Sequence, residues 1–364
     1  MLDKLYFAII IILQNVIGEL IEINSKEIVS KYRAPVMGLI SLWIVLYHTS
    51  MKLPSVLNEI ETQGFAGTDV FLFLSGFGLY YALTKNSDIM EFYKRRVKRI
   101  IPAYIPFLAG SYGCIIINHL SELKSNFLGI FQTFCGNISL LGRIAGLEHQ
   151  TNCYIPLFLW LYFFTPMLYH VICDKTGRKR LINISALIVF VILINITFWG
   201  NERDMKCFSR IFVFIFGIIF ASANSRISKR ITSTLIWFAV FAAGIALIIV
   251  NRKFFPDRLL SCGFEYYPYI LIAPSLSVLL AKVFDVLDRV SVGKAVNKFF
   301  GFLGKYSLGI YFVHSLFFLV VQELIKNRLN NFIWLGLSVA AVIMGIVYQY
   351  IIDLIVKKFS KKTA

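Results

Sequence analysis

The chain is 364 residues long; 58% of its residues are hydrophobic and only 16% are charged. Soluble domains usually contain about 45–50% apolar and about 25% charged residues, so this composition excludes a water-soluble protein and requires much of the surface to face lipid. The net charge of +17 would suit nucleic-acid binding in a soluble chain. In so apolar a chain it favours basic loops on the cytoplasmic side of a membrane, and no nucleic-acid partner is expected.

The first apolar segment, 5–21, is not typical of a cleaved signal peptide. Gln14, Asn15 and Glu19 interrupt it, and no small-residue cleavage site follows. We interpret it as either an interfacial helix or an additional span. Residues 1–33 are therefore assigned to an N-terminal apolar segment and a cytoplasmic lead-in, which precede a membrane domain at 34–356.

Apolar runs of about 16–25 residues recur along that domain, and each is long enough to cross a bilayer as a helix. The sequence therefore predicts an all-α fold, a polytopic transmembrane helical bundle with about ten core spans. The predicted spans are 36–53, 66–83, 101–118, 153–172, 181–199, 208–223, 232–250, 266–284, 306–322 and 332–356. A weaker stretch at 127–141 is interpreted as an interfacial or re-entrant part of a long outer loop.

Basic residues orient the bundle. If the segment before the first span is cytoplasmic, every segment on that side is basic, and these segments hold most of the 37 Lys and Arg residues. Loop Lys and Arg asymmetry sets the orientation of membrane proteins. Both ends of the core are therefore predicted to be cytoplasmic, with a basic cytoplasmic tail at 357–364.

The cysteines show no metal-binding pattern. They are scattered and lack the paired spacing or neighbouring histidines of a metal site, so we interpret them as small apolar residues and expect no metal. The six are Cys114, Cys135, Cys153, Cys173, Cys207 and Cys262.

His48 and Asp69 are ionisable residues inside predicted spans, where such side chains are costly unless they have a role. They are expected at similar depths on consecutive antiparallel helices. An imidazole suits general-base chemistry near neutral pH, and a neighbouring carboxylate orients its ring. We therefore predict His48 as a base oriented by Asp69. The alternatives are a histidine that only packs and an aspartate that only caps its helix.

Two further motifs follow in chain order. Ser75 lies in the stretch FLSGFG, whose small residues allow another helix or a ligand to approach closely. Arg96 and Arg99 share a helix face at the cytoplasmic mouth of the third span. Two guanidinium groups at such a position suit bidentate contacts to phosphate, although positive-inside anchoring also explains them.

Arg210 and His314 are the remaining polar candidates inside spans. Arg210 lies near the outer end of the sixth span, where it either extends to the interface or binds an anionic acceptor. His314 lies in the middle of the ninth span as a cavity-lining or a packed histidine. With Ser75, both are candidates for binding the substrate.

The order and spacing of these motifs resemble the acyltransferase-three family of integral-membrane acyltransferases, which modify surface glycans and related molecules. The resemblance covers the chain from about residue 34 to its end, with a ten-span core. The matching pieces are GLISLWIVLYH, GTDVFLFLSGFGL, FYKRRVKRIIPAY, YIPLFLWLYFFTPML, RIFVFIFGIIFA and YSLGIYFVH.

The resemblance implies a cytoplasmic acyl-CoA donor, usually acetyl-CoA, and a hydroxyl acceptor, usually on a sugar. It matches the family's histidine to His48 and its basic pair to Arg96 and Arg99. One departure is that the family usually has an arginine eleven residues before the histidine, where this chain has Met37. We hypothesise that Arg33, about one helical turn earlier, takes that place. The usual tryptophan near the start of the fourth span is also absent, since Cys153 and Tyr154 stand there.

The sequence thus predicts a multi-pass protein of the plasma or inner membrane. Its expected activity is the transfer of an acyl group, expected to be acetyl, from acyl-CoA to a hydroxyl of a cell-surface or exported polysaccharide. The catalytic residues would be His48 and Asp69, and Arg33, Arg96 and Arg99 would bind the donor. The alternatives are a secondary transporter or exporter of a sugar or lipid-linked glycan and a non-catalytic member of a polysaccharide assembly complex.

Overall fold

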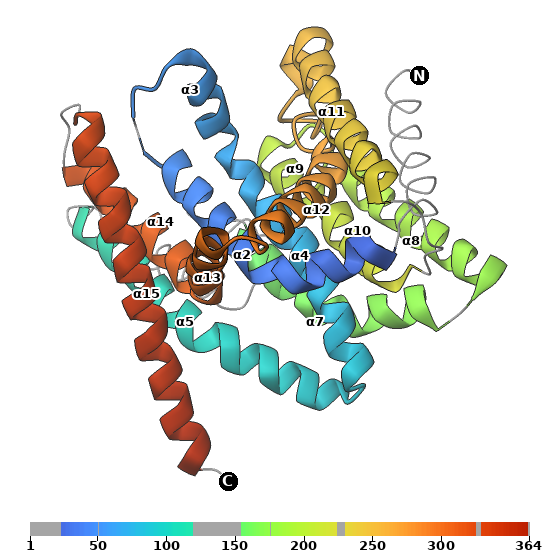
Figure 1. Cartoon of the computed structure of the whole chain (residues 1–364), viewed down its shortest axis with the longest axis horizontal. Helices are drawn as coiled ribbons and strands as arrows, with labels where there is room; N and C mark the ends of the chain where they lie inside the picture. The colour runs from blue at the N-terminus through green and yellow to red at the C-terminus, as the bar shows by residue number, and fades with distance from the viewer. Residues whose placement is uncertain are drawn as a thin grey trace. The chain divides into compact units, whose positions relative to one another are not determined.

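The computed structural model describes residues 23–49, 51–118, 154–174, 176–223, 230–324 and 329–362, and Figure 1 shows the chain. All secondary-structure elements in the described residues are helices, so the all-α prediction is confirmed. The α-helices are α2 (Ile23–Tyr47), α3 (Ser55–Thr62), α4 (Gly67–Lys85), α5 (Ile89–Asn118), α7 (Tyr154–Cys173), α8 (Gly177–Thr197), α9 (Glu202–Phe208), α10 (Ile211–Ser222), α11 (Arg230–Phe254), α12 (Tyr269–Leu287), α13 (Ser291–Lys305), α14 (Ser307–Leu324) and α15 (Asn331–Lys362). There are also two 3-10 helices: η1 (Gln63–Ala66) precedes α4, and η2 (Pro256–Arg258) follows α11.

Each of the ten predicted ranges overlaps a helix, but the number of spans stays a prediction. Eight helical segments among the described residues are long and apolar enough to cross a membrane. The count is nine if the pair α13 and α14, bent by 67°, forms one span. These helices indicate a multi-pass membrane protein. The orientation of the bundle stays a prediction, and the segments 5–21 and 127–141 lie outside the described residues.

The chain forms two compact units, and each is described by itself. The first unit comprises residues 1–36, 68–88 and 164–299; within it α12 packs against α11 and α10, and α10 packs against α8. The second unit comprises residues 37–67, 89–163 and 300–364; within it α14 packs along α15, and α5 contacts both. The proposed division at residues 33 and 356 stays a prediction.

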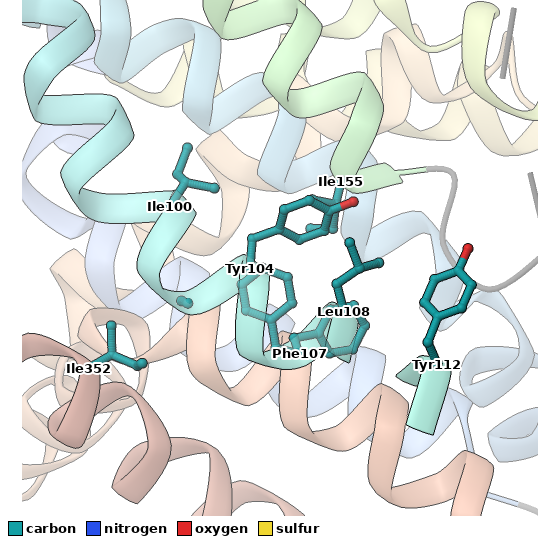
Figure 2. Packing of buried hydrophobic residues seen from close by; sticks show 9 residues of the cluster. Ile100, Tyr104, Phe107, Leu108, Tyr112, Ile155 and Ile352 are labelled. Carbon is teal, nitrogen blue, oxygen red and sulfur yellow. The ribbon is translucent and has the colours of Figure 1, made fainter. Parts of the chain in front are cut away.

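One of the hydrophobic clusters of the second unit is centred on α5. Figure 2 shows Ile100, Tyr104 and Leu108, which recur every four residues on this helix and therefore share one face. Phe107 packs against Phe312 of α14 with ring centres 4.8 Å apart. The apolar stripe of α5 thus fixes α14, the helix that carries His314.

Helix α2 bends at Tyr32, whose backbone leaves helical geometry at φ −105° and ψ 15°. Pro35 follows three residues later. Its ring lacks the N–H group that would bond the carbonyl of Lys31 and also crowds that carbonyl, which is the usual cause of a helix kink. The bend therefore follows directly from the sequence, and it immediately precedes Arg33.

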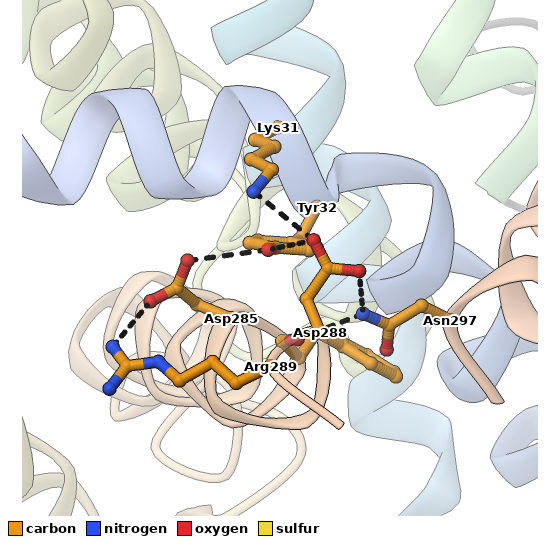
Figure 3. A network of polar contacts seen from close by, with 7 residues as sticks. Lys31, Tyr32, Asp285, Asp288, Arg289 and Asn297 are labelled. Carbon is orange, nitrogen blue, oxygen red and sulfur yellow. Dashed lines mark hydrogen bonds and ion pairs between the residues drawn. The ribbon is translucent and has the colours of Figure 1, made fainter. Parts of the chain in front are cut away.

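A polar network in the first unit holds this bend (Figure 3). The hydroxyl of Tyr32 lies 3.3 Å from Asp285 and 3.1 Å from Asp288, and the ammonium of Lys31 pairs with Asp288 at 3.3 Å. Asn297 of α13 also donates to Asp288, at 3.3 Å. The network thus ties α2 to the end of α12 and the start of α13.

Candidate active site

His48 directly follows α2, which ends at Tyr47. Its backbone N–H donates to the carbonyl of Val45 at 3.2 Å, in a turn that closes the helix. The imidazole is partly buried, and its ring centre lies 5.0 Å from that of Tyr47 and 5.0 Å from that of His314. Ring contacts therefore restrain the imidazole of a residue that stays partly exposed.

His314 lies on α14 and is almost fully buried, with 1% of its surface exposed. Its Nδ1 lies 2.8 Å from the carbonyl oxygen of Ile310, one helical turn earlier. Its Nε2 is buried without a hydrogen-bond partner among the described residues. His314 was predicted as a substrate-binding candidate, and in the structure its ring lies next to that of His48.

The segment between α2 and α4 packs against the end of α2 beside His48. Trp43 donates from Nε1 to the carbonyl of Ile60 at 2.7 Å, and the ring centres of Tyr47 and Phe65 lie 6.0 Å apart. The hydroxyl of Thr49 lies 2.9 Å from a carboxylate oxygen of Glu61. These contacts fix the backbone that leads into and out of His48.

Asp69 forms an ion pair with Arg210 inside the first unit. Its Oδ2 lies 2.6 Å from Nη1 of Arg210, and both side chains have 0% of their surface exposed. The same Nη1 donates to the hydroxyl of Thr68 at 2.8 Å, and the guanidinium lies 4.7 Å from the ring centre of Tyr266. Asp69 and Arg210 therefore balance each other's charge where neither has access to water.

This pairing was not predicted, although the sequence contained a signal for it. Asp69 lies near the outer end of the predicted second span, and Arg210 near the outer end of the sixth. Two opposite charges at the same membrane depth are natural partners, because each would otherwise be buried alone. His48 and Asp69 belong to different units, so the predicted dyad stays a prediction.

The FLSGFG stretch lies on α4, and its glycines act as close-contact positions. A Cβ atom at Gly76 would collide with the backbone of Phe214 on α10, and one at Gly217 of α10 would collide with the backbone of Phe73. The two glycines thus let α4 and α10 approach closely, as small residues do in membrane bundles. Ser75 is buried beside this contact, with 6% of its surface exposed.

Arg33 extends to this same helix. Its guanidinium occupies the space where a Cβ atom at Gly78 would lie. Arg33 is partly buried, and Met37 is partly buried one turn later on α2. In the SGFG motif, Gly76 therefore contacts α10 and Gly78 contacts Arg33. Arg33 is the arginine that we predicted to replace the one absent at Met37.

Arg96 and Arg99 lie on α5 in the second unit. Arg96 is partly buried, with its guanidinium 5.6 Å from the ring centre of Phe92, and its Nε is buried without a hydrogen-bond partner among the described residues. Arg99 is exposed. One arginine is thus oriented by packing, and the other is open to a ligand.

The candidates therefore form separate groups within the two units. The first unit contains the Asp69–Arg210 pair, Ser75 and the contact of Arg33 with Gly78. The second contains His48 with His314, and the two arginines of α5. Within the described residues, no three His, Cys, Asp or Glu side chains cluster as metal ligands would.

Comparison with known proteins identifies what the chain resembles. The profile of a family described as an acyltransferase domain matches residues 38–351. A protein of Acidianus two-tailed virus, ORF330, whose name describes an acetyltransferase, is 25% identical over 316 residues, which cover 80% of this chain and 83% of that protein. No solved structure matches the chain. The matched range contains every site candidate except Arg33.

Proposed function

The chain belongs to the acyltransferase-three family of membrane acyltransferases, and from this premise we propose that it transfers an acetyl group from cytoplasmic acetyl-CoA to a hydroxyl of a cell-surface or exported polysaccharide. The observation that carries the proposal is the restrained, partly accessible imidazole of His48 at the end of α2. The acetyltransferase name of the viral relative supports the acetyl group.

In the proposed reaction, His48 takes the proton of the acceptor hydroxyl as its oxygen attacks the thioester carbonyl. A hydroxyl is a poor nucleophile until a base removes this proton. The tetrahedral intermediate collapses by breaking the carbon–sulfur bond, and the protonated imidazole returns its proton to the CoA thiolate. The products are an acetyl ester and CoA.

The donor's phosphates would bind to arginines. Arg96 and Arg99 present two guanidinium groups from one helix, and the planar fork of arginine matches phosphate oxygens. We propose that Arg33 binds the donor and that Met37, being uncharged, does not.

The proposal is tested with membranes that contain the wild-type chain or His48→Ala, incubated with acetyl-CoA labelled in the acetyl group. We expect base-labile label in polysaccharide with the wild type and a loss of at least about 100-fold with the variant. His170→Ala is the matched control, because His170 is an exposed histidine that pairs with Asp174 on α7. Equal labelling by His48→Ala at equal protein levels would show that His48 is not the base.

The acceptor and the orientation are tested in cells. Surface polysaccharide from a strain that expresses the wild type should contain O-acetyl groups that are absent with His48→Ala. A transporter of sugars would instead respond to ion gradients and would not depend on acetyl-CoA. If only a protein amine or a lipid is acetylated, the acceptor is not a polysaccharide, although the protein is still an acyltransferase.

A further inference from the structure

The protonation of His314 follows from its contacts. A backbone carbonyl only accepts hydrogen bonds, so Nδ1 of His314, which lies 2.8 Å from the carbonyl of Ile310, carries the hydrogen. In the neutral ring the other nitrogen, Nε2, then has a lone pair and no hydrogen. His314 therefore presents an acceptor at Nε2, and this acceptor is buried without a partner among the described residues.

A buried acceptor without a donor is costly, and the adjacent His48 ring offers a donor. The two ring centres are 5.0 Å apart and the ring planes are tilted by 52°. Two imidazoles joined by an N–H···N bond of about 3 Å have centres about 5 Å apart, since each nitrogen lies about 1 Å from its ring centre. The observed separation of the ring centres equals the separation that such a bond would give.

Two tyrosine rings pack against the histidine pair. Tyr311 packs edge-on against His314 with ring centres 5.6 Å apart, and Tyr47 packs edge-on against His48 at 5.0 Å. These contacts hold ring faces and edges in place. The two imidazoles are adjacent within this cluster, with ring centres 5.0 Å apart.

We propose that His314 is a positioning residue: its Nε2 accepts a hydrogen bond from one ring nitrogen of His48 and thereby keeps the other nitrogen of His48 unprotonated for the acceptor hydroxyl. The inference rests on the proposed role of His48 as the base. In this inference the neutral imidazole of His314 orients the ring of His48, a role that the sequence suggested for Asp69.

The proposed bond also fits the charge changes of the reaction. When His48 takes the hydroxyl proton, its imidazolium remains a donor toward the neutral His314, and charged donors form stronger hydrogen bonds. His314 only accepts this hydrogen bond and does not change its protonation in the proposed step. The proton then leaves from the reacting nitrogen of His48 to the thiolate of CoA, so no net proton is gained or lost at the pair.

The direct test reads the tautomer of His48 and does not depend on activity. The full chain, with its five histidines labelled with ¹⁵N, is reconstituted in lipid nanodiscs, and the His48 ring signals are assigned with His48→Gln. We expect one tautomer in the wild type, a mixture in His314→Leu, and one tautomer in His314→Gln, whose amide oxygen keeps an acceptor. His170→Leu is the control and should leave the His48 signals unchanged.

Kinetics supply the second readout on the same variants. With His314→Leu, kcat should fall on the order of 100-fold while KM for acetyl-CoA stays within about 2-fold, and His314→Gln should recover at least about 10-fold. A rise in the acceptor KM with unchanged kcat would show instead that His314 binds the substrate. Equal losses with both variants would indicate only a packing role.

The outcomes separate this inference from the proposed function. If His48→Ala keeps full activity, the proposed base is wrong whatever the tautomer shows. If His48 is essential but its tautomer does not respond to His314→Leu, the positioning role is wrong and the base stands. A response to Asp69→Asn in place of His314→Leu would assign the orientation of His48 to the carboxylate.

Discussion

The two units hold their buried polar residues in opposite ways. In the first unit, Asp69 and Arg210 form a fully buried ion pair in which each charge meets the other. In the second unit, His48 and His314 face each other as rings, one partly accessible and the other with a buried nitrogen that lacks a partner among the described residues. The first pair compensates its charges within the fold, although Oδ1 of Asp69 is also buried without a hydrogen-bond partner among the described residues. The second pair carries no fixed opposite charges and contains a residue, His48, that stays partly exposed.

The difference indicates that one pair contributes mainly to stability and the other mainly to the reaction rate. A compensated ion pair in an apolar interior stabilises one arrangement of α4 and α10, because separating its members would leave a charge without water. A neutral imidazole pair is less costly to bury and can change its protonation during turnover. Stability should therefore depend most on the first pair, and rate on the second.

The largest expected effect is on the ion pair. Arg210→Met leaves the carboxylate of Asp69 buried without its partner, which should lower the free energy of unfolding by about 3–5 kcal/mol. The measurement is thermal unfolding of detergent-solubilised protein, followed by size-exclusion chromatography. His48→Ala in the same assay should stay close to the wild type while its activity is lost.

The double variant Asp69→Asn, Arg210→Met is the control for this comparison, because it removes both charges at once. It should recover most of the lost stability. If Arg210→Met alone is as stable as the wild type, the pair does not hold α4 and α10 together, and the contrast between the two units disappears.

The sequence predicted the helices well, because apolar runs of spanning length leave few alternatives in a membrane. It did less well at their ends. The first predicted span begins at 36, whereas α2 already includes the residues from Ile23 onward. Polar residues before Arg33 have partners in the first unit. Lys26 bonds the carbonyl of Ala223, and Ser25 accepts a hydrogen bond from Trp237 at 3.1 Å.

The sequence suggests candidate site residues, whose roles stay predictions, but it does not show which of them contact each other. Intramembrane charges and histidines are visible in the sequence because they are costly there. Which of them meet depends on tertiary packing: Asp69 and Arg210 are 141 residues apart, and His314 is brought to His48 by helix α14. The role of Gly78 was also invisible, because only the fold shows that Arg33 fills the space above it.

A smaller effect is expected at that glycine. In Gly78→Ala the new methyl group displaces the guanidinium of Arg33, which can move because it ends a flexible side chain. Alanine also favours a helix over glycine by about 0.5–1 kcal/mol, so folding should not suffer. We expect KM for acetyl-CoA to rise about 3- to 10-fold, as a bound phosphate or carbonyl would lose its partner.

Gly336→Ala on α15 is the matched control, since a Cβ atom there meets nothing within 4 Å. It should change neither KM nor kcat. Arg33→Ala should raise KM at least as much as Gly78→Ala. An unchanged KM in Arg33→Ala would show that this arginine does not bind the donor and that the departure at Met37 has no substitute there.

The smallest effect is expected at the bend of α2, which sets the direction of Arg33. Tyr32→Phe removes the hydroxyl that contacts Asp285 and Asp288 and should cost about 1 kcal/mol, with a rise of about 2-fold in KM for acetyl-CoA and no change in kcat. Both changes are measured on purified protein against the wild type.

The pH dependence of this difference gives a further check. Hydrogen bonds from Tyr32 and Lys31 lower the pKa of Asp288. A group whose pKa is lower in the folded state stabilises the fold above its ordinary pKa, and that stabilisation is lost as the pH falls through the lowered value. The stability difference between wild type and Tyr32→Phe should therefore persist from neutral pH down to about pH 4 and shrink below it. A difference that instead vanished between pH 7 and pH 5 would mean that Asp288 does not hold the bend, and that the first unit positions Arg33 by the proline kink and Gly78 alone.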